Sequence, residues 1–176
     1  ENQFYYPPNQ DLASEKGEGI AILSSDKSFG KGAISNGGGG GNSHNSGGGG
    51  GSNAANGGFG GYNFEGTPCT NTPFDNRGIG GKSLAYNNLL NKVFLGGGGG
   101  AGHTNNPQAF EAKGGNGGGI AILICDKIKT NGNKFLANGN NGYSCGSSGS
   151  LCHEGMGGGG AGGSILIMNN NYLDNS

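Results

Sequence analysis

Short apolar runs alternate with runs of glycine along most of this 176-residue chain. The clearest apolar run is Ile120–Cys125, in which every residue is apolar and half are β-branched isoleucines. Because the run is short and glycines closely precede it, it predicts a β-strand, whereas a helix would lose about 1 kcal/mol at each glycine relative to alanine. Both faces of this strand are apolar, so we expect it in a parallel sheet that is covered on both sides.

The apolar run belongs to an internal repeat. The sequence of residues 19–23 recurs at residues 119–123, and in both copies Asp-Lys follows after two further residues. Each copy then continues to a second short apolar stretch that ends in Asn-Gly, so the repeated unit is a pair of strands. Weaker echoes lie at residues 81–96 and 163–168. Repeats of a unit that cannot bury its own face indicate a solenoid, in which neighbouring units stack.

Glycine accounts for 45 of the 176 residues, against an average share of roughly 7% in proteins. The glycines form compact runs that aromatic residues punctuate, whereas flexible linkers mix serine with glycine. We therefore expect ordered polyglycine II segments, which are extended helices with three residues per turn that pair laterally through their backbones. The alternative is a set of slack tethers, because glycine loses much entropy on ordering. The runs lie at residues 37–41, 47–51, 57–61, 96–100, 114–119 and 157–163.

Asparagine followed by glycine marks the predicted corners of the fold. Asparagine tolerates left-handed backbone geometry, and its side-chain amide caps turns. These pairs begin at Asn36, Asn131, Asn138 and Asn141.

Residues 1–16 differ from the rest because they are rich in aromatic residues and proline and contain no glycine. We expect them to form an N-terminal cap or linker, followed by one glycine-rich β-repeat domain over residues 17–176. Since the chain opens on Glu1 without an apolar leader and closes on an unfinished strand pair, we expect it to be part of a longer chain. The predicted fold class is all-β: a glycine-rich, parallel β-solenoid-like stack with ordered polyglycine II-type segments.

Charge and hydropathy exclude two classes of partner. The chain has 10 Lys+Arg and 11 Asp+Glu, for a formal net charge of -1, and its basic residues are scattered. A nucleic-acid binder normally presents a basic patch or stripe to phosphates. The longest apolar run, Ile120–Cys125, is far shorter than the roughly 20 residues that span a bilayer. We expect no nucleic-acid partner and no membrane insertion.

The residues that usually carry catalysis do not form a recognisable constellation. Nucleotide motifs match glycine runs trivially. No serine, cysteine or carboxylate is spaced to orient a histidine, and the acidic residues Glu65, Asp75, Glu111 and Glu154 lie in separate predicted loops. We expect a protein that is not an enzyme and that has no catalytic residues, no cofactor and no metal site. A β-helix enzyme acting on polysaccharides is the minority alternative.

The four cysteines form an even set that permits three pairings. A disulfide between Cys145 and Cys152 would close a short loop rich in serine and glycine, and we name that pair as the candidate. C-x2-C spacing is missing, which disfavours zinc. Cys125 is expected to be a small buried residue at a strand end, and the pairing of Cys69 stays open. An even cysteine set favours an extracellular or cell-surface location.

Four polar segments dotted with aromatic residues separate the glycine runs: residues 42–46, 63–77, 103–113 and 143–156. Loops held on a rigid scaffold are where binding residues concentrate. We expect contacts from His44, Phe64, Phe74, His103, Phe110, Tyr143 and His153.

Residues 93–106 and 114–123 resemble the glycine-rich repeat regions of large bacterial cell-surface proteins of the Bacteroidetes type, including secreted adhesins and gliding-associated proteins. The resemblance covers residues 81–168, with a decayed copy over residues 17–61. It implies a non-catalytic structural and adhesive module of a secreted surface or filament protein, delivered by a dedicated (type IX) secretion system. The implied partners are other modules of the same chain or the secretion machinery. No site residues carry over.

The glycine runs are also similar to the polyglycine-helix domains of the anaplastic lymphoma kinase receptor family and of phage tail-tip adhesins. That similarity implies an alternative function, a receptor-binding tip whose loops contact a surface glycan or a protein. The repeated Ile-Ala-Ile-Leu strands are not expected in those families.

Overall fold

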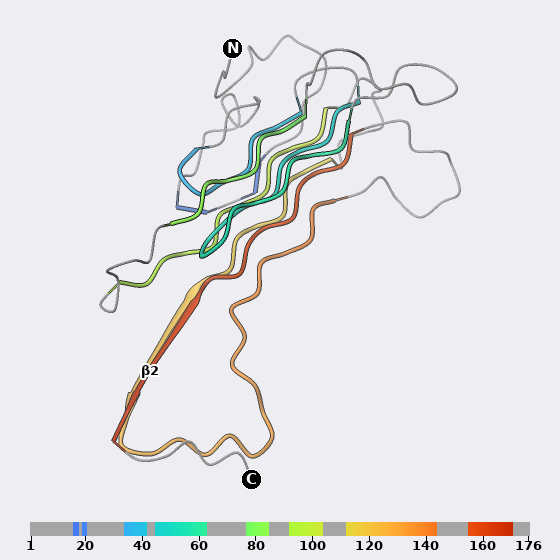
Figure 1. Cartoon of the computed structure of the whole chain (residues 1–176). Coiled ribbons are helices and arrows are strands. Elements are labelled where there is room, and N and C mark those ends of the chain that lie inside the picture. The colour runs from blue at the N-terminus through green and yellow to red at the C-terminus, as the bar shows by residue number, and fades with distance from the viewer. Residues whose placement is uncertain are drawn as a thin grey trace.

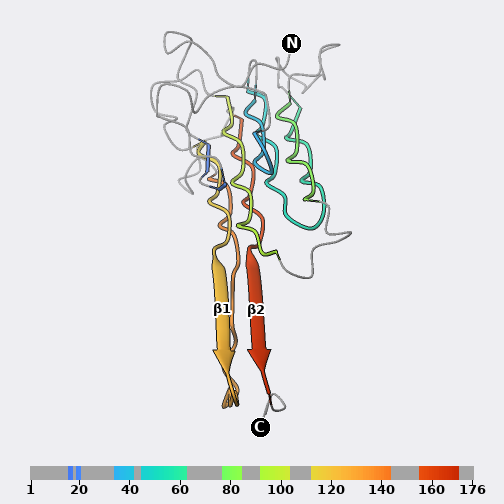
Figure 2. The same ribbon diagram turned by 90° about the vertical axis from the view of Figure 1, so that its left-hand side faces the viewer.

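The computed structural model describes residues 16–17, 19–20, 34–41, 45–62, 77–84, 92–103, 112–143 and 155–170. Over these residues the chain forms an elongated body, in which extended glycine-rich segments run side by side and two β-strands project from one end (Figures 1 and 2). The strands are β1, Ile120–Cys125, and β2, Ser164–Asn169, and the described part of the chain has no other strand and no helix.

The two strands pair in parallel, from Ile120 opposite Ser164 to Cys125 opposite Asn169. The strand predicted at Ile120–Cys125 is therefore confirmed with the same bounds, and the weaker echo at residues 163–168 forms β2. Of the first repeat copy, residues 19–20 and 34–37 lie among the described residues, and neither part forms a strand. The second stretch of the later copy, residues 135–139, is not a strand either, so the prediction that each copy is a pair of strands is wrong at both second stretches. Two strands make one sheet without stacked layers, so the solenoid-like stack stays a prediction.

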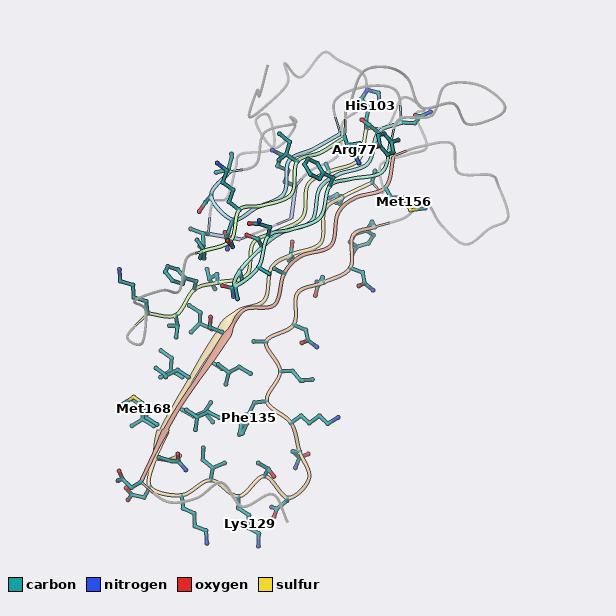
Figure 3. All side chains as sticks on the ribbon, viewed as in Figure 1. Arg77, His103, Lys129, Phe135, Met156 and Met168 are labelled. Carbon is teal, nitrogen blue, oxygen red and sulfur yellow. The ribbon has the colours of Figure 1, made fainter. Side chains whose placement is uncertain are left out.

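The expectation that both faces of β1 are covered is wrong. Ile120, Ile122 and Ile124 share one face, and Ile124 is 74% exposed. Met168 pairs with Ile124 on this face. Residues 126–136 follow β1 and run back along the strands as the returning segment, and Phe135 from this segment lies on the other side of the strands (Figure 3). The sheet has only two strands, and the returning segment passes only one of its faces, so nothing in the described part of the chain covers the isoleucines.

The glycine-rich segments pair laterally through their backbones. Along residues 47–52, consecutive N–H groups donate to three neighbouring segments in turn, and the order repeats after three residues. The direction of the N–H groups therefore rotates by one third of a turn per residue, as in an extended helix with three residues per turn. The bonds are 2.7–2.9 Å long and run from Gly47 to Gly61, Gly48 to Met156, Gly49 to Gly39, Gly50 to Gly58, Gly51 to Gly159 and Ser52 to Asn36.

Residues 96–103 lie at the centre of these segments. Their N–H groups donate to residues 112–118 and 46–52, and their carbonyls accept from residues 155–161, 38–41 and Gly17. The backbone pairing that the sequence predicts between glycine runs is therefore present. We call the laterally paired segments the glycine bundle, which comprises residues 17, 19, 36–41, 46–53, 57–62, 78–84, 96–103, 112–119, 137–143 and 155–163.

Glycine is needed in the bundle because it lacks a side chain. Among the described glycines only Gly132 has a positive φ, so backbone freedom does not explain the glycines of the bundle. A Cβ on Gly100 would overlap the carbonyl oxygen of Gly39, and one on Gly99 would overlap that of Gly158. The Cα–H groups of these glycines thus point at neighbouring carbonyls, in the manner of Cα–H···O contacts.

Polar side chains form hydrogen bonds between segments near one end of the bundle. Asn36 is only 1% exposed, and its amide donates to the carbonyls of Ser52 at 3.0 Å and Leu95 at 2.9 Å. The amide of Asn53 donates to the carbonyls of Gly162 and Gly163. The bundle is therefore held by backbone and amide groups. Among the described residues, the buried hydrophobic ones are Ala101, Ala112 and Ile128.

Two of the four predicted corners are turns. Asn131 and Gly132 have φ of 48° and 77°, and the N–H of Asn133 donates to the carbonyl of Thr130 at 2.9 Å. Asn36 lies in a turn closed by a bond of 2.8 Å from the N–H of Gly37 to the carbonyl of residue 34.

The corners predicted at Asn138 and Asn141 are wrong. Both lie inside the extended segment 137–143 and have no positive φ. Asn140 and Tyr143, three residues apart, donate to the carbonyls of residues 116 and 113 in the neighbouring segment. Lateral pairing thus overrides the local preference of Asn-Gly for turns.

Candidate functional site

The described residues that border the four predicted contact loops lie at one end of the glycine bundle, opposite β1 and β2 (Figure 1). We call this the loop end. The residues that border the loops are hydrogen-bonded to one another or to their immediate neighbours across the segments. The backbone bonds are 2.8–3.0 Å long and run from Gly41 to Ala101, Gly47 to Gly61, Gly78 to Gly47, Gly102 to Ala112, His103 to Ser46, Tyr143 to Lys113 and Gly155 to His103.

Two of the predicted contact residues, His103 and Tyr143, lie among the described residues, and both are at the loop end. His103 is half-buried and Tyr143 is exposed. The other predictions for this region lie outside the described residues: His44, Phe64, Phe74, Phe110 and His153, the candidate disulfide of Cys145 and Cys152, and the carboxylates Glu65, Asp75, Glu111 and Glu154.

His103 is held at the loop end by its ring and its backbone. Its Nδ1 accepts a hydrogen bond of 3.3 Å from the backbone N–H of Asn45, so this ring nitrogen carries no proton. Its backbone N–H donates to Ser46, and its carbonyl accepts from Gly155. The imidazole is thus positioned between the bases of three predicted loops.

Asn45 combines two unusual features beside His103. Its φ of 61° is left-handed, and its side chain is buried. Among the described contacts, the side-chain oxygen Oδ1 accepts no hydrogen bond. A buried polar group without a partner costs about 1–3 kcal/mol, so the geometry here is imposed by the surrounding segments.

An aromatic cluster at the side of the bundle was not among the predicted site residues. The guanidinium of Arg77 lies over the rings of Phe59 and Tyr62, at 5.0 and 3.9 Å from their centroids. Arg77 lies at the same end of the bundle as His103 (Figure 3). The sequence Gly-Gly-Phe-Gly-Gly-Tyr contains the signal, because three-residue spacing places both rings on one side of a polyglycine II segment.

The remaining titratable groups are dispersed. The described residues contain no group of three or more His, Cys, Asp or Glu side chains that could hold a metal ion. Cys125 is a half-buried free thiol at the end of β1. Burial lowers the pKa of Lys16 from 10.5 to about 8. A search of the described residues for a helix that could cross a bilayer finds none.

No family model matches the chain, and no curated protein or solved structure is significantly similar to it.

Proposed function

We propose that the chain is a non-catalytic adhesive module of a secreted or cell-surface protein, and that the loop end is its contact surface. The observation that carries the proposal is the convergence of the borders of all four predicted loops on one end of the bundle. Binding residues concentrate on loops that a rigid scaffold positions, so such an arrangement suits recognition of a partner.

The bundle itself supports a structural part in this function. Residues 96–103 are paired with neighbouring segments on several sides, and the N–H groups of residues 47–52 all have backbone acceptors. A body held by parallel rows of backbone bonds is stiff along its length, as a spacer between an anchor and a partner must be. The partners we propose are a surface glycan or protein receptor at the loop end and other modules of the same exported chain elsewhere.

A second candidate function, a receptor-binding tip of the polyglycine-helix type, is favoured by the same convergence. The two functions differ in where the module acts: a tip binds only through the loop end, whereas a filament module also contacts neighbouring modules through its sides or its strands.

Replacement of the predicted loops tests the proposal. Residues 63–76 and 104–111 would each be exchanged for a Gly-Ser linker of equal length, and binding would be measured on glycan arrays and on intact cells. The matched control exchanges Ala54 and Ala55, two exposed residues at the opposite end of the bundle, for serine. We expect the loop replacements to weaken binding at least tenfold and the control to leave it unchanged.

Amide exchange of residues 96–103 would show that the bundle survives each replacement. Binding that is undiminished without the loops would refute the loop end as the contact surface. Turnover of a polysaccharide that is lost when Glu65, Asp75, Glu111 or Glu154 is replaced by glutamine would instead support the enzyme alternative.

A further inference from the structure

The sheet of β1 and β2 leaves the outer edge of β1 open. The two strands pair with each other over six residues, and among the described hydrogen bonds none joins the backbone of Ile120–Cys125 to a segment other than β2. The returning segment lies over one face of the sheet, so no described segment runs along the outer edge of β1 (Figures 1 and 2). At the start of β2, by contrast, the hydroxyl of Ser164 exchanges hydrogen bonds with the backbone of Phe94. β1 therefore offers the freer edge.

This edge lacks the features that normally prevent pairing between chains. Exposed strand edges are usually protected by charged residues, by proline or by a β-bulge. β1 has the sequence Ile-Ala-Ile-Leu-Ile-Cys, without a charged residue or proline, and its register with β2 runs one to one without a bulge. An uncharged six-residue segment of high β-propensity at an open edge is typical of strands that pair with another chain.

The exposed side chains of β1 form a regular apolar row. Ile120, Ile122 and Ile124 are 40%, 55% and 74% exposed, so the exposure increases with distance from the glycine bundle. Alternate side chains of a strand share a face, and a strand that pairs with it places its own alternate side chains beside them. The row therefore fits a strand that carries isoleucine at every second position.

We propose that the outer edge of β1 pairs antiparallel with β1 of a second copy of the chain, which gives a four-stranded sheet in the order β2-β1-β1-β2. The new pairing continues the ladder that already joins β1 to β2. In an antiparallel ladder each strand both donates and accepts, so two identical edges are complementary. The interface is isologous, as a two-fold dimer requires, and its axis passes through Ile122.

The two faces of β1 select this register. Residues that lie opposite one another in an antiparallel pair share a face of the sheet. With Ile122 opposite itself, Ile120 of one copy lies opposite Ile124 of the other, and all six isoleucines line one face. A shift by one residue would place them beside Ala121 and Leu123 instead. Branched side chains pack well against neighbours on a pleated surface, so the aligned register is the more stable one.

The four-stranded sheet is also better supported than the sheet of one chain. An isolated pair of strands is marginally stable in water, whereas three or more strands with a hydrophobic face can be stable. Because the two copies run antiparallel and the strands project from the end opposite the loop end, the two loop ends face in opposite directions (Figure 1). The dimer can then bridge two surfaces. That bridging rests on the proposed function, whereas the pairing of the strands does not.

Charges placed at the two-fold axis test the pairing. Ile122→Lys would set two lysines opposite one another in the dimer, and Ile122→Glu two glutamates, and like charges directly opposite destabilise a strand pair. Association would be measured by analytical ultracentrifugation over a concentration series, without any receptor and with a reducing agent, because Cys125 is a free thiol. We expect the wild-type chain to dimerise and each variant alone to associate at least tenfold more weakly. An equimolar mixture of the two variants should recover association, because lysine then faces glutamate.

The matched control is Met168→Lys. Met168 is 54% exposed, close to the 55% of Ile122, and lies on the same face of the sheet, but it belongs to β2 and so lies away from the proposed interface. This variant should dimerise like the wild type. Recovery in the mixed sample also shows that both Ile122 variants are folded.

Four outcomes would each overturn the proposal. The first is a wild-type chain that is monomeric throughout, as expected if a different partner occupies the edge. The second is an Ile122 variant that dimerises normally by itself, and the third is a mixture of the two variants that does not recover association. The fourth is a Met168→Lys variant that associates as weakly as Ile122→Lys, which would indicate packing through the exposed face of the sheet rather than pairing at its edge.

Discussion

The guanidinium of Arg77 lies over the ring of Tyr62, 3.9 Å from its centroid, and also over the ring of Phe59. In a segment that rises about 3.1 Å per residue, side chains three residues apart are about 9 Å apart. The guanidinium lies 3.9 Å from one ring centroid and 5.0 Å from the other, so one planar cation between the two rings contacts both. Residues 57–62 are joined to residues 77–84 by this contact as well as by backbone hydrogen bonds from Gly57 and Gly60.

Replacement of Arg77 by alanine should weaken the association of residues 57–62 with residues 77–84. Loss of the cation–π contacts is expected to lower the free energy of unfolding by about 0.5–2 kcal/mol and to speed amide exchange at Gly57 and Gly60. Urea denaturation and exchange measured by NMR would test both effects. Lys82→Ala removes an exposed cation from the same neighbouring segment and should have a negligible effect. Equal effects of the two variants would contradict the prediction.

Two glycine variants should differ sharply in stability. Gly100→Ala places a Cβ on the carbonyl oxygen of Gly39, so two segments must move apart, and we expect a loss of about 3 kcal/mol or more. Gly58→Ala meets no atom and should change the free energy of unfolding by less than about 1 kcal/mol, in the stabilising direction. Thermal unfolding of dilute samples would measure both. Similar losses in the two variants would show that close approach of the segments at Gly100 does not require glycine.

The turn at Asn131 and Gly132 offers a test of backbone strain. Gly132 has a φ of 77°, so Gly132→Ala should lower stability by about 1–2 kcal/mol. Asn131→Gly retains access to the left-handed region and should stay within about 0.5 kcal/mol of the wild type. Urea denaturation would test both variants, and a destabilising Asn131→Gly would point to a role for its side chain beyond the turn.

Stability should increase with pH above about 8 because of Lys16. Burial lowers its pKa from 10.5 to about 8, so between these values the unfolded chain binds more protons than the folded one. The free-energy cost of burying the charged amine is therefore fully present below pH 8 and decreases as the pH rises toward 10.5. It amounts to about 3 kcal/mol at most. In urea denaturation at several pH values, Lys16→Met should be more stable than the wild type at pH 7, and this difference should vanish at high pH.

Local sequence signals predicted the elements that depend on nearest neighbours. The six apolar residues of β1 fix a strand with the observed bounds, and Asn131-Gly132 fixes a turn. Compact glycine runs predicted lateral pairing, because their close packing needs residues without side chains.

The partners within the bundle could not be predicted. Glycine runs have no side chains that distinguish one neighbour from another, so their sequences do not encode which segments pair or in which register. The specifying groups are a few polar residues at the segment ends, such as Asn36 and Asn53, whose amides bond carbonyls of distant segments. The same long-range pairing explains why Asn138 and Asn141 are extended.

The candidate site was predictable in part. Polarity predicts four loops, whose residues lie largely outside the described part of the chain. The convergence of the residues that border them on one end follows from the up-and-down course of the segments, which local sequence patterns do not encode. The contact of Arg77 with two rings was missed because it joins separate segments, although the spacing of Phe59 and Tyr62 carried half of the signal.

A body whose buried groups are mostly peptide units should respond unusually to temperature. Exposure of apolar surface raises the heat capacity on unfolding, whereas exposure of polar surface lowers it. Since the bundle buries few hydrophobic side chains, its heat-capacity change should be small and its stability curve flat. Cooling weakens hydrophobic cores but has little to weaken here, so the module should resist cold denaturation better than an ordinary domain of its size.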